Sequence, residues 1–193
     1  VPYRASGVEI RSSDGREFFQ FRFDIKTDDP LAFGVLDSLA FEVSPVLADS
    51  VLAEISLSGI ESGQRGIVEV PLGVDTLFVY DIRTVFANAT RPGFDGIELD
   101  VPLAAQFVNL ERDGVELLEG TDFSLVASAG RLRIILAEPS AENSLLRLRF
   151  RSAIYQASLF FEGRIFNTNA EVASLPQSIE AGDARREVAS NRI

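Results

Sequence analysis

The chain has 193 residues, of which 46% are hydrophobic and 24% are charged, and its formal net charge at pH 7 is -11. It contains no Cys and no His, which excludes disulfides, thiolate chemistry, soft-metal sites and a histidine general base. The acidic balance also excludes nucleic acid as a partner, because binding to phosphates requires clustered basic residues.

Alternating apolar and polar residues predict strands along almost the whole chain. Residues 19–26 alternate strictly and place Phe19, Phe21, Phe23 and Ile25 on one face. Two segments could be helical: 47–54, with at most two turns, and 181–190, which we expect to be an extended tail. Further strand-like runs lie at 39–43, 55–57, 67–70, 77–82, 97–101, 107–110, 123–126, 131–136 and 146–150. The sequence therefore predicts an all-β fold of one or two antiparallel β-sandwich modules, immunoglobulin-like or jelly-roll-like.

An internal repeat indicates how the chain is divided. Residues 21–27 (FRFDIKT) match residues 78–84 (FVYDIRT), and residues 37–43 match residues 95–101 in the same order. Two matched strand pairs favour duplication of a β unit, although alternating strands can also resemble one another by chance. We expect an N-terminal β module over 1–75, a C-terminal β-sandwich over 76–184, and a linker-like tail over 185–193.

The sequence of the second unit contains short motifs that resemble those of a known class of domains. Asp113-Gly114 opens a hairpin-like turn, Gly120-Thr121-Asp122-Phe123 follows, and residues 146–150 read LRLRF. The stretch 76–184 thus resembles the immunoglobulin-like repeat modules of large secreted bacterial surface proteins. Within it, residues 175–184 are similar to the linkers that follow these modules. That resemblance implies a β-sandwich serving as a spacer, adhesin or anchor, with no catalytic residues.

The composition leaves a pair of carboxylates possible as a catalytic arrangement. Glu98 and Asp100 share one strand face at roughly 7 Å, and glycosidases need two placed acids. Laminarinase-type glucanases have a similar strand but require a further Glu just beyond it, where this chain reads Val101-Pro102-Leu103. We therefore expect no enzyme activity and interpret the pair as part of a solvated or ion-paired strand face.

A weak calcium motif lies near the C-terminus. Asn167, Asn169 and Glu171 offer side-chain oxygens at alternate positions, a spacing that a hard Ca²⁺ ion can use. The residues do not follow the EF-hand loop pattern. A polar surface loop is the simpler interpretation, and we predict no other cofactor.

A row of arginines is the most conspicuous surface feature. Arg147, Arg149 and Arg151 alternate with apolar residues. If their strand shares a sheet with the strand of Arg131 and Arg133, five guanidinium groups lie on one outer face. That face could accept an acidic partner, or the arginines could pair across strands with acids such as Glu98, Asp100 and Glu111.

Adjacent aromatic residues predict a contact surface. In residues 155–161, Phe160 and Phe161 must face opposite sides of a regular strand, so one ring lies outside the core. Tyr155 begins the same run. Exposed rings at strand ends suit subunit packing or a sugar ligand. We expect an interface with protein partners, including copies of the chain itself, or alternatively with a glycan.

These features together favour a non-catalytic structural or adhesive module of an extracellular or cell-surface bacterial assembly. The alternatives are a carbohydrate-binding module and an accessory domain of a secreted enzyme. The chain begins at Val1 and contains no Met, so we expect a processed product or a fragment of a longer protein. No apolar run approaches the roughly 18 residues needed to cross a bilayer, so we expect no membrane insertion.

Overall fold

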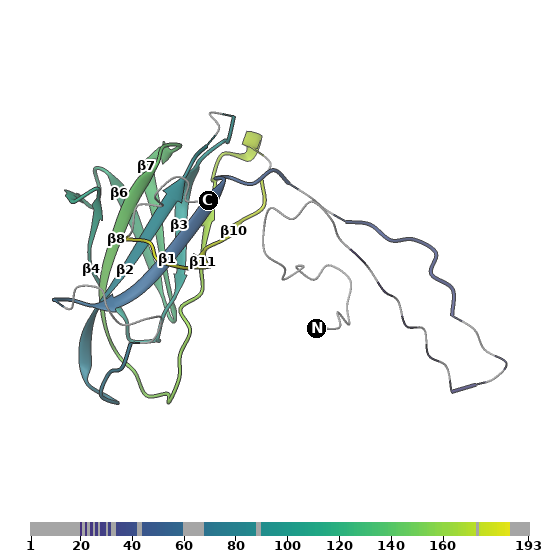
Figure 1. The fold of residues 1–193 in the computed structure, drawn as a ribbon, viewed down its shortest axis with the longest axis horizontal. Coiled ribbons are helices and arrows are strands. Elements are labelled where there is room, and N and C mark those ends of the chain that lie inside the picture. Colours follow the sequence, from purple (N-terminus) through teal and green to yellow (C-terminus); the bar gives the residue numbers. More distant parts are fainter. Residues whose placement is uncertain are drawn as a thin grey trace, which may run out of the picture.

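The computed structural model is an all-β sandwich of two packed sheets (Figure 1). It describes residues 34–41, 44–59, 68–87, 90–172 and 174–185, with isolated positions at 20, 22, 24, 26, 28, 29 and 31. The elements are β1 Ser50–Leu57, β2 Asp75–Val85, β3 Phe94–Asp100, β4 Gln106–Arg112, β5 Val115–Leu117, β6 Phe123–Ser128, β7 Arg131–Ser140, β8 Ser144–Ala153, β9 Gly163–Phe166, the 3₁₀ turn η1 Ala170–Val172, β10 Gln177–Ser178 and β11 Glu180–Ala181. The predicted fold class is confirmed. Within the described part of the chain, no helix is long and apolar enough to cross a membrane.

The strands form two sheets whose neighbours are mostly antiparallel. The six-stranded sheet has the order β11-β1-β2-β8-β4-β5, and the five-stranded sheet has the order β10-β9-β3-β7-β6. Only β1 and β11 pair in parallel among the pairs of described strands. Because β10 and β11 belong to one short C-terminal segment, that segment joins the two sheets along one side of the sandwich.

The alternation predicted for residues 146–150 sets the packing of the six-stranded sheet. Leu146, Leu148 and Phe150 are fully buried, and the intervening arginines lie on the outer face. Phe150 stacks on Phe78 of β2 with ring centroids 5.4 Å apart. Burial raises the pKa of Tyr80, also on β2, above its ordinary value, so this phenol stays protonated. The core therefore lies between the sheets, at the apolar phase of each strand.

The segment with helix-forming residues is a strand in the structure. Residues 50–57 pair with β2 along their whole length, from Ser50 opposite Val85 to Leu57 opposite Phe78. Val51 and Ala53 point into the core, whereas Leu52 lies only partly buried on the alternate phase. Tertiary pairing thus overrides the local helix propensity of this stretch.

The expected domain boundary at residue 75 falls inside this sheet. β1 lies before it and β2 begins at Asp75 itself, and the two strands are hydrogen-bonded neighbours. Leu47 and Ala48 are also fully buried in the common core. Residues 47–57 therefore pack in the same sandwich as the strands of 76–184. The division remains a prediction for residues 1–43, most of which lie outside the described residues.

The two matched stretches of the second repeat pair, 37–43 and 95–101, lie in different environments. Residues 95–100 belong to the buried strand β3, and residue 101 directly follows it. In the matching stretch 37–43, the described residues 37–41 are exposed and form no strand. Of residues 21–27, only 22, 24 and 26 are described. The sequence similarity between 37–43 and 95–101 therefore does not correspond to two equivalent strands.

Gln177 joins the C-terminal segment to the start of β1. Its side-chain oxygen accepts hydrogen bonds from the backbone nitrogens of Leu47 at 2.8 Å and Ala48 at 3.0 Å. Its amide nitrogen donates to the Ala48 carbonyl at 3.1 Å. All three residues are buried, so one side chain satisfies three backbone groups that are shielded from water.

Replacing Gln177 with Leu is expected to lower the free energy of unfolding by about 2–3 kcal/mol, because two buried N–H groups lose their acceptor. Chemical denaturation followed by far-ultraviolet circular dichroism measures the change. Gln106→Leu, at an exposed position of β4, is the matched control and should change stability by less than about 0.5 kcal/mol. Equal effects of the two substitutions would show that the bridge contributes nothing.

Candidate interaction surfaces

The two arginine rows lie on opposite faces of the sandwich. Arg147, Arg149 and Arg151 belong to β8 in the six-stranded sheet, whereas Arg131 and Arg133 belong to β7 in the five-stranded sheet. The condition for five guanidinium groups on one face, that both strands belong to one sheet, is therefore not met. Periodicity assigns a side chain to a phase of its strand, but it does not say in which sheet that strand lies.

The β8 arginines are each paired with a carboxylate on a neighbouring strand or segment. Arg147 binds Asp81 of β2 through two nitrogens, at 2.7 and 3.3 Å. Arg149 pairs with Glu111 of β4, and Arg151 pairs with Asp75 at 2.8 Å. Each β8 arginine thus has a carboxylate partner on the outer face, so the arginines act there as cross-strand partners.

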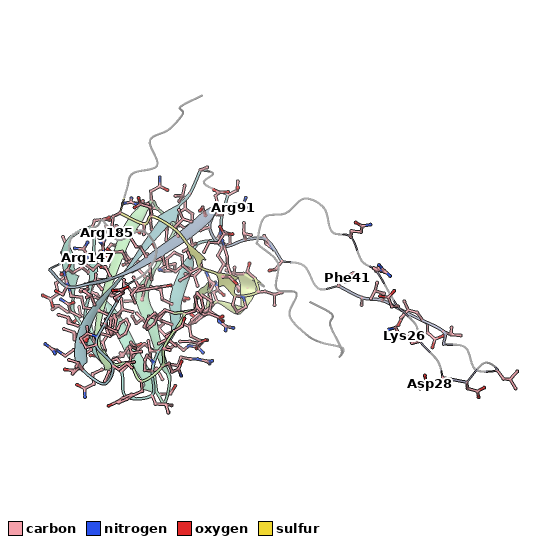
Figure 2. The ribbon with its side chains drawn as sticks, turned by 60° about the horizontal axis from the view of Figure 1, so that its bottom comes forward. Lys26, Asp28, Phe41, Arg91, Arg147 and Arg185 are labelled. Atoms are coloured by element: carbon pink, nitrogen blue, oxygen red, sulfur yellow. The ribbon has the colours of Figure 1, made fainter. Side chains whose placement is uncertain are left out.

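Asp81 is the most enclosed of these acids. Its side chain is fully buried although it lies on the outer face of the sheet. Arg185, from the C-terminal segment, forms a second ion pair with it and also donates to the Ser56 hydroxyl. Figure 2 shows Arg147 and Arg185 side by side on this face. A buried carboxylate held by two guanidinium groups anchors the end of the described chain to the sheet.

Glu98 and Asp100 are ion-paired on the other face. Glu98, which is 8% exposed, has guanidinium nitrogens of Arg131, Arg133 and Arg164 at 3.4, 3.7 and 3.6 Å. Arg131 also binds Asp100 at 3.1 Å. The predicted pairing of arginines with Glu98, Asp100 and Glu111 is therefore confirmed. Both acids of the candidate catalytic pair are held by cations on an outer sheet face.

The side-chain oxygens of the two asparagines in the calcium candidate are engaged in local turns. The Asn167 oxygen accepts from the backbone nitrogen of Asn169 at 2.9 Å, and the Asn169 oxygen accepts from Glu171 at 3.0 Å. Such bonds are typical of Asx turns. Within the described part of the chain, no group of three carboxylates is placed to hold a metal ion. Calcium binding by these residues stays a prediction.

The adjacent phenylalanines separate as expected. Phe161 packs against the core, with its ring centroid 5.7 Å from Phe78 and 5.6 Å from Phe150. Phe160 is 84% exposed, and Tyr155 in the same loop is 78% exposed. Phe161 thus anchors the loop, whereas the rings of Phe160 and Tyr155 face solvent.

Three further apolar side chains are exposed at the same end of the sandwich. This end is formed by the turns that join β1 to β2, β3 to β4 and β8 to β9. It lies at the bottom of Figure 1. We call the five exposed side chains at this end the apolar tip: Leu72 (65% exposed), Val74 (50%), Leu103 (80%), Tyr155 and Phe160. The sequence singled out the two aromatic members, but the aliphatic ones come from loops far apart in the chain.

Hydrogen bonds fix the loops that carry the apolar tip. The backbone nitrogen of Gly73 donates to the carbonyl of Ile154 at 2.8 Å. The Tyr155 ring packs so closely over Gly73 that a Cβ there would lie 3.2 Å from it. The nitrogen of Asp100 donates to the Glu162 carbonyl at 2.9 Å. The tip is therefore presented by loops tied to one another and to a strand end.

Comparisons with known proteins identify no family. No protein-family model matches the sequence, and no curated protein matches it. Among solved structures, the N-terminal domain of the Streptococcus gordonii adhesin Sgo0707 is similar, with a TM-score of 0.43 and 12% sequence identity. The matched region covers 69% of this chain and 33% of that one.

Proposed function

We propose that this chain is a non-catalytic structural or adhesive module of an extracellular or cell-surface assembly, and that it contacts a protein partner through the apolar tip. The observation that carries the proposal is the gathering of five exposed large apolar side chains at one end of the sandwich. Exposed apolar groups are usual on proteins when scattered, but a cluster of them marks an interaction site.

The chemistry of the tip suits a protein interface. Removing apolar surface from water contributes roughly 25 cal/mol per Å², and two of the five side chains are aromatic, the type enriched in interface cores. The five side chains of the tip are uncharged, and the exposed acids Asp75 and Glu162 flank them in the sequence. Since the loops are already tied in place, binding would require little ordering of the backbone.

The aromatic members of the tip support a second candidate function. Tyr155 and Phe160 both expose most of their rings, and the faces of such rings can stack on sugars. A carbohydrate-binding module would use these two side chains and would not need Leu72, Val74 or Leu103. The two functions therefore differ in which part of the tip matters and in the chemistry of the ligand.

The double substitution Tyr155→Ser/Phe160→Ser is expected to weaken binding to a protein partner at least about tenfold, a loss of about 1.4 kcal/mol. Binding is measured by biolayer interferometry against a panel of immobilised cell-surface and extracellular-matrix proteins, with a glycan array in parallel. Val115→Ser/Leu118→Ser is the matched control, because these side chains are 67% and 61% exposed but lie outside the tip.

Each outcome decides between the candidates. Protein binding that the tip variant loses and the control retains supports the proposed function. Glycan binding with the same dependence, and no protein binding, supports the carbohydrate-binding module instead. Binding that is indifferent to the tip variant contradicts both.

A further inference from the structure

Acidic side chains border the apolar tip on each of the three chain segments that form it. No Lys or Arg occurs within three residues of any tip side chain in the sequence, whereas four acids do. A residue spans at most about 3.6 Å of chain, so these acids lie close to the tip, and we call them the rim. They are Glu69 and Asp75 on either side of Leu72 and Val74, Asp100 before Leu103, and Glu162 after Phe160.

Two of the four rim acids have an arginine partner from a neighbouring strand. Asp75 binds Arg151 at 2.8 Å. Asp100 binds Arg131 at 3.1 Å, and the same arginine also lies 3.4 Å from Glu98. The other two rim acids, at positions 69 and 162, are exposed and have no ion pair or side-chain hydrogen bond with the described part of the chain. Four carboxylates and two guanidinium groups leave the rim with an excess of two negative charges.

Glu162 also has a like charge beside it. The register of β3 and β9, extended by one pair, sets it opposite Asp100, whose backbone nitrogen donates to the Glu162 carbonyl at 2.9 Å. Opposite residues of an antiparallel pair share a face, and like charges there repel one another. Arg164, two residues further along, contacts Glu98 instead, at 3.6 Å. A cation supplied by a partner would therefore relieve a repulsion that is present in the free protein.

The charge of the rim also bears on whether the partner is a second copy of the chain. In a two-fold contact between tips, each rim would face an identical rim, so carboxylates would meet carboxylates. The net charge of -11 on each copy adds a longer-range repulsion. An apolar patch bordered by Lys or Arg gains ion pairs at the same positions. The rim thus disfavours a copy that presents its own tip and favours a basic partner.

We propose that the partner of the apolar tip is a basic protein surface, an apolar patch bordered by Lys or Arg side chains that pair with Glu69 and Glu162. This inference rests on the proposed function and specifies its partner. The two parts of the contact have different effects. Burial of the apolar side chains slows dissociation, whereas charges on an exposed rim mainly speed association and disfavour partners of the wrong charge.

The test selects ligands for the full chain from a display library of random peptides. Counter-selection against the tip variant, which lacks both exposed rings, keeps only peptides that bind through the tip. These peptides are expected to be enriched in Lys and Arg together with apolar residues. The selection is repeated on Glu69→Gln/Glu162→Gln, for which the enrichment in basic residues should disappear. Glu138→Gln/Glu142→Gln is the matched control, because it removes the same charge from two exposed positions beside the β7–β8 turn, at the end opposite the tip.

The association rate constants of the selected peptides provide a second measurement. Glu69→Gln/Glu162→Gln is expected to lower the association rate constant at least about threefold at low ionic strength and to weaken its dependence on salt. The dissociation rate constant should change less. The control variant should associate like the wild type, and circular dichroism confirms that both variants are folded.

Several results would overturn the inference. Peptides that bind through the tip without enrichment in basic residues contradict it, as do rate constants that the rim variant and the control variant change equally. Both results leave the proposed use of the tip intact. A selection that yields no peptide dependent on the tip also overturns the inference, and the protein panel then decides the proposed function separately.

Discussion

Replacing Asp81 with Ala is expected to lower the free energy of unfolding by about 3 kcal/mol, because it leaves two partly buried guanidinium groups without their carboxylate. The Asp81 side chain is fully buried, whereas those of Arg147 and Arg185 are 33% and 18% exposed. This result does not require the free energy of attraction between the charges to exceed the free-energy cost of removing them from water. The loss arises from the cations that remain, since they were desolvated in the presence of the acid.

Asp75→Ala is the matched control for this substitution. Asp75 lies on the same strand and pairs with Arg151, the third arginine of the β8 row, but its side chain is 62% exposed. An exposed pair contributes at most about 1 kcal/mol, so this variant should unfold close to the wild type. Urea denaturation followed by circular dichroism compares the two. If both variants lose the same stability, the enclosure of Asp81 has no energetic consequence.

The Asp81 substitution also reports on the C-terminal segment. Arg83 donates from its side chain to the backbone carbonyls of Ala184, at 2.5 Å, and Arg185, at 3.3 Å. Arg185 itself reaches Asp81. Without that carboxylate, the segment keeps its hydrogen bonds to Arg83 and loses its ion pair, so hydrogen exchange at residues 180–185 should accelerate more than exchange within β8.

The sequence predicts the strands more reliably than it predicts their neighbours. The alternation of residues 146–150 is enough to place Leu148 inward and Arg147 outward, since the side-chain period of a strand is two. It cannot reveal that Arg131 lies in the other sheet, because that depends on strand order. Residues 47–54 mislead for a related reason: local helix propensity is weaker than pairing with β2 along eight residues.

Parts of the candidate surfaces were also predictable from local sequence patterns, whereas other parts depend on the fold. Adjacent Phe160 and Phe161 must separate in an extended chain, and the structure packs the Phe161 ring against the core and exposes the Phe160 ring. Leu72 and Leu103 join the apolar tip only through the fold, and no spacing in the sequence connects them to Tyr155. Gln177 is equally inaccessible to sequence reasoning, because the backbone groups that it binds lie about 130 residues earlier. Local patterns thus predict exposure, whereas long-range contacts determine which exposed groups meet.

Phe150→Ala is the second substitution with a large expected effect, a loss of about 4 kcal/mol in the free energy of unfolding. Phe150 is fully buried at the centre of a row of rings, opposite Phe78 of β2 on one side and Phe107 of β4 on the other. It also packs against Phe161 from the β8–β9 loop. Truncation removes the burial of one ring and leaves a cavity that two neighbouring strands and a loop cannot collapse to fill.

Phe160→Ala provides the control, since it removes the same ring from a position that is 84% exposed and should change stability by less than about 0.5 kcal/mol. Thermal unfolding of the two variants tests this difference.

Binding through the apolar tip should depend on both residues, although stability depends on Phe150 alone. Phe160→Ala removes a ring from the tip directly, whereas Phe150→Ala loosens the packing of Phe161, the side chain that anchors the same loop. We therefore expect Phe160→Ala to lose binding without losing stability, and Phe150→Ala to lose both. A stable protein with unchanged binding after Phe160→Ala would mean that the exposed ring is not part of the contact surface.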